Sequence, residues 1–376
     1  MATKVEGLIG DKYELSRVLG RGAVGVVYAA KNLRTGRRVA IKSLQVRGVL
    51  DPQDPDLLRF EQEARIAGSL ESQHIAQVLD IERDPATGLP FLVMELLRGE
   101  DLQALLDRVG PLPVDVALRI ATQACAGLDA AHGAGVVHRD IKPGNLFLAR
   151  REGGEVVVKI LDFGIAKIRR LPPDASASAA SGILAAPQES MTETGQLLGS
   201  PLYMSPEQVA GAKDIDARSD VFSLGVTLYA MVCGKAPHAG IKSFASLLQH
   251  LETTPPPPLR EVAPWVPPEI AALVERATRI DRGERIPSAA ALLESMAPFL
   301  SGGTALREDM LVGSGKVPAE EVKAHAESAP SAAAEGASDA KIAQSNENGP
   351  SWRWLIVISV AVALVTAVAV AAWLGR

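Results

Sequence analysis

One stretch of the chain, His138 to Gly164, constrains the structure more than any other. It begins with HRDIKPGN (138–145) and ends with DFG (162–164), and a β-type run over 156–160 lies between them. Carboxylate and amide oxygens are the hard ligands that divalent cations prefer, and a carboxylate can also accept a proton. The stretch therefore predicts a strand with metal-binding and base groups on the loops at its two ends.

Three glycines near the amino terminus, Gly20, Gly22 and Gly25, have GxGxxG spacing. Glycine has no Cβ, so the backbone here can approach a phosphate group closely. Dinucleotide-binding folds use the same spacing, but there a helix follows the glycines. Here a β-type run over 24–30 follows them, which predicts a hairpin that covers phosphate groups as a lid.

A lone lysine, Lys42, follows the apolar residues 39–41 of a predicted strand. A surface lysine with its stem along the sheet is the ordinary interpretation, but the glycine hairpin just before it favours phosphate binding. The helix predicted over 56–70 carries two acids, Glu61 and Glu63, that could pair with Lys42. Glu63 is preferred because it lies on a different helix face from its polar neighbours.

The rest of the chain divides into recognisable parts. Residues 12–98 are predicted to be mainly strands around one helix, and the chain turns helical from Asp101 onward. Residues 171–190, rich in Ala, Ser and Pro, predict a flexible insertion, and residues 301–350 predict a disordered linker. The main predicted helices lie over 117–133, 220–232, 243–252, 268–280 and 287–299.

The run Leu355 to Leu374 has twenty residues and no charge. At about 1.5 Å rise per residue, a helix of this length spans about 30 Å, the thickness of a bilayer core. Trp352, Trp354 and Trp373 bracket the run, as aromatic residues do at membrane interfaces. It predicts one transmembrane helix. A buried core helix is the alternative, and it is disfavoured because the run is apolar on every face.

Composition argues against other classes of protein. A net charge of -5 gives no reason to expect nucleic-acid binding. The two cysteines, Cys125 and Cys233, each lie in an apolar helical pattern, which predicts buried thiols and no disulfide or zinc site. This cysteine usage fits a reducing compartment.

Together these residues resemble the eukaryotic-like (Hanks-type) serine/threonine protein kinases of bacteria, over roughly residues 10–300. The resemblance implies an α+β, bilobal fold with a β-rich N-lobe of about residues 10–97 and a helical C-lobe of about residues 98–300. It also implies ATP as the phosphate donor and proteins as substrates. The pair Lys142-Pro143 is the form found in members that act on serine and threonine.

The resemblance also implies a role for each motif residue. Asp140 would be the catalytic base, Lys142 would contact the γ-phosphate, and Lys42, paired with Glu63, would contact the α- and β-phosphates. Asn145 and Asp162 would hold Mg²⁺, for which Mn²⁺ is an alternative. The nucleotide would also contact Leu19, Gly20, Gly22, Gly25, Val27, Ala40, Met94, Glu95, Leu97 and Phe147.

Within that set, Val27, Ala40 and Phe147 would sandwich the adenine. The backbone at Glu95 and Leu97 would hydrogen-bond the adenine edge, and Met94 would be the gatekeeper. Beyond the nucleotide, the resemblance implies an ion pair between Glu207 and Arg285 and a role for Asp220 in bracing the backbone of the catalytic loop.

Regulation and location follow as expectations. Thr192 and Thr194 resemble an autophosphorylated threonine pair, and Arg139 could bind the resulting phosphate. Phosphorylation of one chain by another would require a transient homodimer. Because ATP is cytosolic, Leu355 to Leu374 would anchor a cytoplasmic kinase domain to the cell inner membrane.

Two other function classes stay open beside an active kinase. One is a membrane-anchored pseudokinase that acts as a scaffold. Against it, Lys42, Asp140, Asn145 and Asp162 are all present. The other is a small-molecule phosphotransferase, which the helical-lobe elements Ser205-Pro206-Glu207 and Arg285 disfavour.

Overall fold

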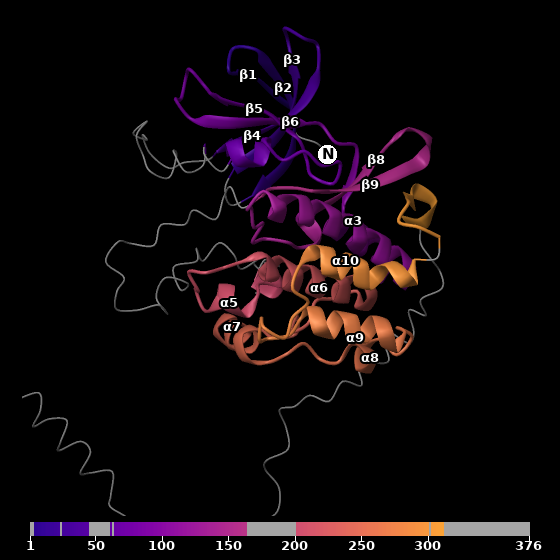
Figure 1. Ribbon diagram of the computed structural model, residues 1–376. Helices are drawn as coiled ribbons and strands as arrows, with labels where there is room; N and C mark the ends of the chain where they lie inside the picture. The colour runs from indigo at the N-terminus through magenta and orange to yellow at the C-terminus, as the bar shows by residue number, and fades with distance from the viewer. Residues whose placement is uncertain are drawn as a thin grey trace, which may run out of the picture. The chain divides into compact units, whose positions relative to one another are not determined.

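The computed structural model describes residues 4–22, 25–44, 61, 64–163, 201–300 and 302–311, and all of them belong to one compact unit, Met1–Ser328. Two β-sheets and a group of helices build this unit (Figure 1). One lobe is a six-stranded sheet, and helices dominate the other. The predicted bilobal α+β arrangement is therefore confirmed.

Several predicted features lie outside the described residues. They are Glu63, Thr192, Thr194, the insertion over 171–190, the linker from 312 onward, and the run Leu355 to Leu374. Among the helices that the structure describes, none combines the length and the apolar character that a bilayer crossing requires.

The N-lobe sheet has the strand order β1-β2-β3-β4-β6-β5, and each neighbouring pair is antiparallel. Gly22 pairs with Gly25 across β2 and β3, so the predicted glycine hairpin is confirmed. The strands are β1 (Lys4–Ile9), β2 (Tyr13–Gly22), β3 (Gly25–Asn32), β4 (Arg38–Leu44), β5 (Val78–Arg83) and β6 (Pro90–Glu95).

The side chains of strand β4 show that one face of this sheet packs in the N-lobe core and the other faces the candidate site. Successive side chains of a strand point to opposite faces. Val39 and Ile41 are buried with Tyr13 and other apolar residues in a small N-lobe cluster. Ala40 and Lys42 point to the other face. Leu92, opposite Lys42, belongs to the main core cluster that continues into the helical lobe. The second face therefore lies at the junction of the lobes.

The second sheet has the order β10-β9-β8-β7. Strands β8 and β9 form an antiparallel hairpin in which Leu146 pairs with Ile160. Only β9 is predicted from the sequence, because β7 and β10 are too short to show an alternating pattern. The strands are β7 (Gly99–Asp101), β8 (Leu146–Arg150), β9 (Glu155–Ile160) and β10 (Leu306–Arg307).

The helices of the C-lobe gather around α3 and α6 (Figure 1). The predicted helices over 117–133, 220–232, 243–252, 268–280 and 287–299 are confirmed, with shifted ends. Helix α6 is buried from Ser219 to Cys233, as its continuous apolar sequence predicts. The helices are α2 (Leu102–Val109), α3 (Val114–Gly133), α5 (Pro206–Val209), α6 (Ala217–Cys233), α7 (Phe244–Thr253), α8 (Leu259–Val262), α9 (Pro268–Ala277) and α10 (Ala289–Met296).

The folded region is longer at both ends than the predicted 10–300. Strand β1 starts at Lys4 and pairs with β2, so the sheet includes residues before position 10. At the other end, β10 pairs with β9, and Leu306 and Leu311 are buried in the main core. The predicted linker boundary at residue 301 is therefore wrong for residues 302–311. Their composition is mostly polar, but two of their leucines are buried in the core.

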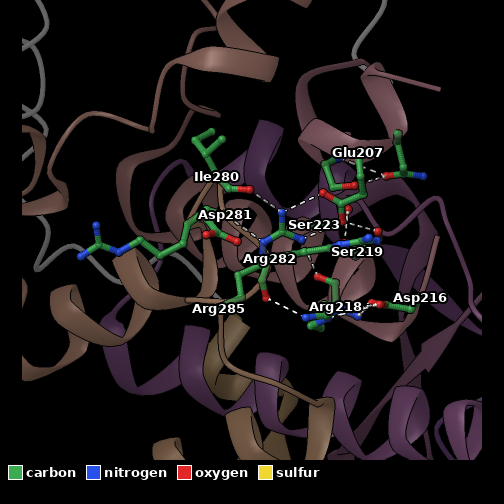
Figure 2. A network of polar contacts seen from close by, with 12 residues as sticks. Glu207, Asp216, Arg218, Ser219, Ser223, Ile280, Asp281, Arg282 and Arg285 are labelled. Atoms are coloured by element: carbon green, nitrogen blue, oxygen red, sulfur yellow. Dashed lines mark hydrogen bonds and ion pairs between the residues drawn. The ribbon is translucent and has the colours of Figure 1, made fainter. Parts of the chain in front are cut away.

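A buried ion pair links α5 to the loop before α10, as the resemblance implies. Arg285 makes a two-pronged pair with Glu207, with Nη1–Oε1 and Nη2–Oε2 both at 2.7 Å. Its other donors reach the carbonyls of Arg279, Arg218 and Ile280, so all five guanidinium N–H groups have partners (Figure 2). These hydrogen bonds offset the desolvation cost of burying the pair, because every donor is satisfied.

Ionisation of Glu207 depends on these contacts. Burial opposes the charge, but hydrogen bonds from Arg285 and Ser219 outweigh burial and lower the pKa of Glu207 from 4.5 to about 2. The carboxylate is therefore charged in the folded protein over the whole physiological range, and it holds α5 against the start of α6.

The substitution Glu207→Gln is expected to lower the free energy of unfolding at pH 7 by about 3 kcal/mol, because it leaves the Arg285 charge buried and unpaired. The pKa of Glu207 is lower in the folded state, so its stabilisation is complete above pH 4.5 and is lost as the pH falls through about 2. Urea unfolding at pH 7 and near pH 2 measures the difference in the free energy of unfolding between the variant and wild type. Glu269→Gln, at an exposed position of α9, is the control. A difference between Glu207→Gln and wild type that does not shrink with falling pH would contradict the assignment.

Candidate active site

A fully buried carboxylate, Asp220 of α6, holds the loop that follows α3. Its Oδ2 accepts the backbone N–H of His138 and its Oδ1 accepts that of Arg139, both at 2.8 Å. Oδ2 also lies 2.8 Å from His132 Nε2. Arg139 has a φ of 66°, which is rare for a residue other than glycine and needs such external support. The predicted bracing role of Asp220 is confirmed.

Within this loop, two side chains converge on Asp140. Lys142 Nζ donates to Asp140 Oδ2 at 2.8 Å, and Asn145 Nδ2 donates to the same oxygen at 3.0 Å. Asn145 Nδ2 also donates to the Asp140 carbonyl at 2.7 Å. These contacts hold one carboxylate oxygen beside a cation and an amide, so the carboxylate is kept in one orientation.

The β8–β9 hairpin brings Asn145 and Asp162 together. Asn145 directly precedes β8, and Asp162 follows β9 after Leu161. Because the strands are antiparallel, both residues lie at the same end of the hairpin, and Leu161 N–H donates to the Asn145 carbonyl at 2.8 Å. The prediction that a single strand separates these groups is therefore wrong: β8, unpredicted, folds back and places them side by side.

Lys42 reaches across from the N-lobe to this hairpin. Its Nζ lies 2.7 Å from Asp162 Oδ1, with the lysine side chain 6% and the aspartate side chain 40% exposed. Glu61, one of the two acids that could have paired with Lys42, instead pairs with Arg83 at 2.8 Å. The preferred partner, Glu63, lies outside the described residues.

His138 is a buried neutral histidine at the centre of the site. Its Nδ1 accepts the N–H of Asp140 at 3.1 Å, and its Nε2 lies 2.8 Å from the Leu161 carbonyl. A carbonyl only accepts, so these partners assign the hydrogen to Nε2. Burial lowers the pKa of His138, because the charged form would lose its hydration. Its ring also contacts Phe163 edge to face, with centroids 4.8 Å apart.

The predicted adenine contacts of the N-lobe share one sheet face. Val27 pairs with Lys42, and Ala40 pairs with Met94, and residues directly opposite in a sheet point the same way. Ala40 and Lys42 are two positions apart, so all four side chains lie on one face. Phe147 lies on β8 of the second sheet and is partly exposed.

The remaining predicted nucleotide contacts lie at the edges of this face. Gly20 pairs with Val27 across β2 and β3, and Leu19 beside it is 38% exposed. The N–H of Glu95 donates to the Gln77 carbonyl at 3.0 Å, so a purine contact at Glu95 would use its carbonyl oxygen. Leu97 follows in the connector between the lobes.

One buried ion pair at this connector was not predicted from the sequence. Lys159 of β9 is buried, and its Nζ lies 2.7 Å from Glu95 Oε1 and 3.1 Å from the Ile75 carbonyl. Lys159 is opposite Phe147 in the hairpin and three positions before Asp162. The available signal was the same as at Lys42, a single lysine inside an apolar strand sequence.

The donor set at the end of the hairpin fits a divalent cation. Asn145 uses its amide nitrogen toward Asp140, so the atom it could offer to a metal is its carbonyl oxygen. Asp162 already binds a cation, the Lys42 ammonium, through its carboxylate. An amide oxygen and a carboxylate are hard oxygen ligands of the kind that Mg²⁺ and Mn²⁺ take.

A glycine hairpin, a strand lysine and a loop acid bonded to a lysine and an amide, all set between two lobes, are features of a phosphate-transferring enzyme of the protein kinase type. Residues 13–296 match the family described as "Protein kinase domain". The chain belongs to this family.

Named relatives agree with this membership. The chain is 37% identical over 278 residues to the serine/threonine-protein kinase PknA of Mycobacterium tuberculosis, an alignment that covers 73% of this chain and 58% of that protein. It is 34% identical over 295 residues to the serine/threonine-protein kinase Pkn1 of Myxococcus xanthus, covering 78% of this chain and 39% of that protein. The chain thus spans less than two thirds of these relatives.

A solved structure supports the fold. The crystal structure of the Mycobacterium tuberculosis PknI kinase domain superposes with a TM-score of 0.57 and 25% sequence identity. The match covers 79% of this chain and 99% of that one.

The environment of His138 generates a prediction for NMR. Because the pKa of His138 is lowered by burial, the ring should be neutral at pH 7, with its hydrogen on Nε2, and should gain a proton only at a lower pH than an exposed histidine. ¹⁵N-detected spectra of the imidazole, assigned with the variant His138→Asn, distinguish this tautomer from the Nδ1–H form and from imidazolium. A resonance that titrates near pH 6.5, the ordinary histidine value, would contradict the assignment.

Proposed function

We propose that this chain is an active serine/threonine protein kinase that transfers the γ-phosphate of ATP to hydroxyl groups of proteins. The observation that carries this proposal is the convergence of Lys142 and Asn145 on one oxygen of Asp140, at 2.8 and 3.0 Å. Membership in the protein kinase family supports the reaction. The names of the relatives, serine/threonine-protein kinases, support the class of hydroxyl.

In the proposed reaction, Asp140 orients the substrate hydroxyl and accepts its proton. The hydroxyl oxygen forms a bond to the γ-phosphorus while the bond from that phosphorus to the β–γ bridging oxygen breaks, so ADP leaves. The hydrogen bonds from Lys142 and Asn145 preorganise the carboxylate for this step. Proton acceptance by a positioned base typically contributes ~10²–10⁴-fold to the rate.

Charge stabilisation is the other contribution of this site. The transferring phosphoryl group spreads negative charge over its oxygens, and fixed positive charges beside them lower the barrier. Lys42 and Lys142 are two such charges, one from each lobe. Mg²⁺ or Mn²⁺, held by Asn145 and Asp162, would neutralise the β- and γ-phosphates further.

The nucleotide base would lie against the face that carries Val27, Ala40 and Met94, with Phe147 on its other side. The Lys159–Glu95 ion pair ties the wall beside the base to the strand that leads to Asp162. Lys159 therefore connects the purine end of the site with its metal end.

A pseudokinase scaffold is the alternative function, and it is disfavoured because Lys42, Asp140, Asn145 and Asp162 are all present, with Asn145 bonded to Asp140 and Lys42 paired with Asp162. A small-molecule phosphotransferase is disfavoured by the helical elements around Glu207 and Arg285.

The substitution Asp140→Asn tests the proposed reaction. It keeps the size of the side chain and removes the base, so the rate of phosphate transfer should fall by ~10²–10⁴-fold. The measurement is incorporation of ³²P from γ-labelled ATP into the full chain and into a generic protein substrate, followed by phosphoamino-acid analysis. Asp129→Asn, on the exposed side of α3, is the matched control. Equal incorporation by Asp140→Asn and wild type would refute the enzyme assignment and favour the scaffold.

We further propose that Thr192 and Thr194 are autophosphorylated and that Arg139 binds the phosphate. Arg139 sits beside the base, with its backbone held by Asp220 and by Gln208 of α5. Phosphopeptide mapping after incubation with ATP should locate label on these threonines. If one chain phosphorylates another in a transient homodimer, the initial rate should rise with the square of the concentration. If neither threonine carries label, the proposal is contradicted.

The proposed location is the cell inner membrane, with the kinase domain in the cytoplasm and the run Leu355 to Leu374 as its anchor. The support is the uncharged length of this run. Leu364→Arg places a charge at its centre and should weaken insertion by about 2.5–3.5 kcal/mol. Cell fractionation should then show less kinase in the membrane pellet than for wild type. Recovery of wild type entirely in the soluble fraction would disprove the anchor.

A further inference from the structure

A short segment after the last C-lobe helix, residues 302–311, lies beyond the family match at 13–296 and is nevertheless part of the fold. We call it the strap. Its strand β10 pairs with the outer edge of β9, with Leu306 opposite Val156 and Arg307 opposite Glu155. In Figure 1 the strap is the orange segment beside the β8–β9 hairpin. It covers the start of this strand edge, and the backbone of His74 and Ala76 covers its end at Ile160.

A buried arginine of α3 hydrogen-bonds to the backbone of the strap. Arg119 is 8% exposed, and its Nη1 donates to the carbonyls of Gly303 and of Ala305, the latter at 2.8 Å. The strap backbone is shaped for this contact. Gly303 has a φ of +75°, and a Cβ at Gly302 would lie 2.9 Å from Arg119 Nη2. The strap carbonyls are therefore the acceptors that stabilise this guanidinium charge at its low exposure.

A glutamine one turn along α3 joins the strap to β9 directly. Gln123 Nε2 donates to the Thr304 carbonyl at 2.9 Å, and its Oε1 accepts the N–H of Val158 at 2.8 Å. The same side chain therefore hydrogen-bonds to the backbone of the strap and to the backbone of β9. Any shift of the strap that reorients Gln123 also removes the hydrogen bond at Val158.

Apolar and charged contacts complete the attachment. Leu306 is 0% and Leu311 is 4% exposed, and both belong to the main core cluster. Glu308 pairs with Arg150, at the far end of β8, at 2.9 Å. The strap thus touches both strands of the hairpin whose other end carries Asn145 and Asp162.

From these contacts we propose that the strap positions β9, and through it the Asp162 carboxylate, for metal binding in phosphate transfer, with Arg119 and Gln123 as the positioning residues. The proposal rests on the proposed kinase function. A strand rises about 3.3 Å per residue, so the Gln123 contact at Val158 lies about 7 Å along β9 from its last residue, Ile160, which is two positions before Asp162. Strand β8 bonds to one side of β9. On the other side, the strap bonds at Glu155 and Val156, Gln123 bonds at Val158, and the backbone of His74 and Ala76 bonds at Ile160. Residues that orient metal ligands from a second layer typically change metal affinity or activity by ~10–100-fold when removed.

The test uses the full chain with Arg119→Met, which removes the donors but keeps a long apolar stem, and Leu306→Asn, which loosens the strap from the core. Arg276→Met, on the exposed side of α9, is the matched control. Arg119→Lys keeps the charge with fewer donors and should be intermediate. Mn²⁺ affinity is measured by electron paramagnetic resonance with a non-hydrolysable ATP analogue. We expect the two strap variants to bind Mn²⁺ ~10-fold more weakly, and the control to match wild type.

Hydrogen exchange distinguishes positioning from a general loss of stability. In the strap variants the Val158 amide should lose protection, while the amides of α6 keep theirs. Two outcomes would overturn the proposal. One is loss of protection at both Val158 and the amides of α6 in the strap variants. The other is a strap variant whose Val158 amide loses protection while its Mn²⁺ affinity stays at the wild-type value. Both readouts are independent of turnover. A wild-type chain that binds Mn²⁺ and nucleotide in this strap-dependent way but transfers no phosphate would refute the proposed function alone.

Discussion

The geometry of the site depends on one buried carboxylate, that of Asp220. Two backbone N–H groups and a histidine bond to it, and this set of partners is what allows a charge to exist at full burial. In return, the carboxylate holds the loop in a conformation that the unsupported backbone disfavours at Arg139. His138, turned inward by the same contact, then supports Asp140 through Nδ1 and Leu161 through Nε2. The buried carboxylate of Asp220 thereby fixes the positions of both the base, Asp140, and Leu161, the residue next to Asp162.

Helix α6 extends this influence to the segment around Glu207. Ser219, next to Asp220, bonds to Glu207, and Ser223 donates to the Tyr203 carbonyl at 2.7 Å. Arg285 closes the same network from the loop before α10 (Figure 2). Its guanidinium also lies 4.9 Å from the centroid of the Phe222 ring. The catalytic loop and the segment around Glu207 are therefore anchored on adjacent positions of a single buried helix. Movement of one would disturb the other.

The β8–β9 hairpin supplies the other half of the site, and it is held from three directions. Its backbone joins the loop at Leu161, Lys159 ties it to the connector between the lobes, and the strap pairs with the start of its outer edge. Lys42 then bridges from the N-lobe sheet to Asp162. These contacts come from segments far apart in the sequence, which is why a pattern along the chain indicates the residue types but not their partners.

Much of the fold was predictable from local patterns. The apolar run that ends at Lys42 correctly predicted a strand, and the apolar run at 220–232 correctly predicted a buried helix. Strands β7, β8 and β10 were not predictable, because they are short and their pairing is decided by neighbours elsewhere in the chain. The polar composition of 302–311 suggested a linker, because the carbonyl acceptors for Arg119 belong to the backbone and leave no trace in side-chain chemistry.

The sequence by itself determined the chemical groups of this protein: the glycines of the hairpin, the strand lysine, the loop acid with its lysine and amide, and the second acid before Phe163. Their spacing was enough for the fold class and for the resemblance to a family. Only the tertiary structure decided their geometry. It placed Asn145 and Asp162 at one end of a hairpin, paired Lys42 with Asp162, and gave Lys159, Arg119 and Gln123 their contacts. The physical reason is that residue identity is local, whereas a hydrogen bond or ion pair exists only when folding brings distant backbone and side-chain groups within about 3 Å.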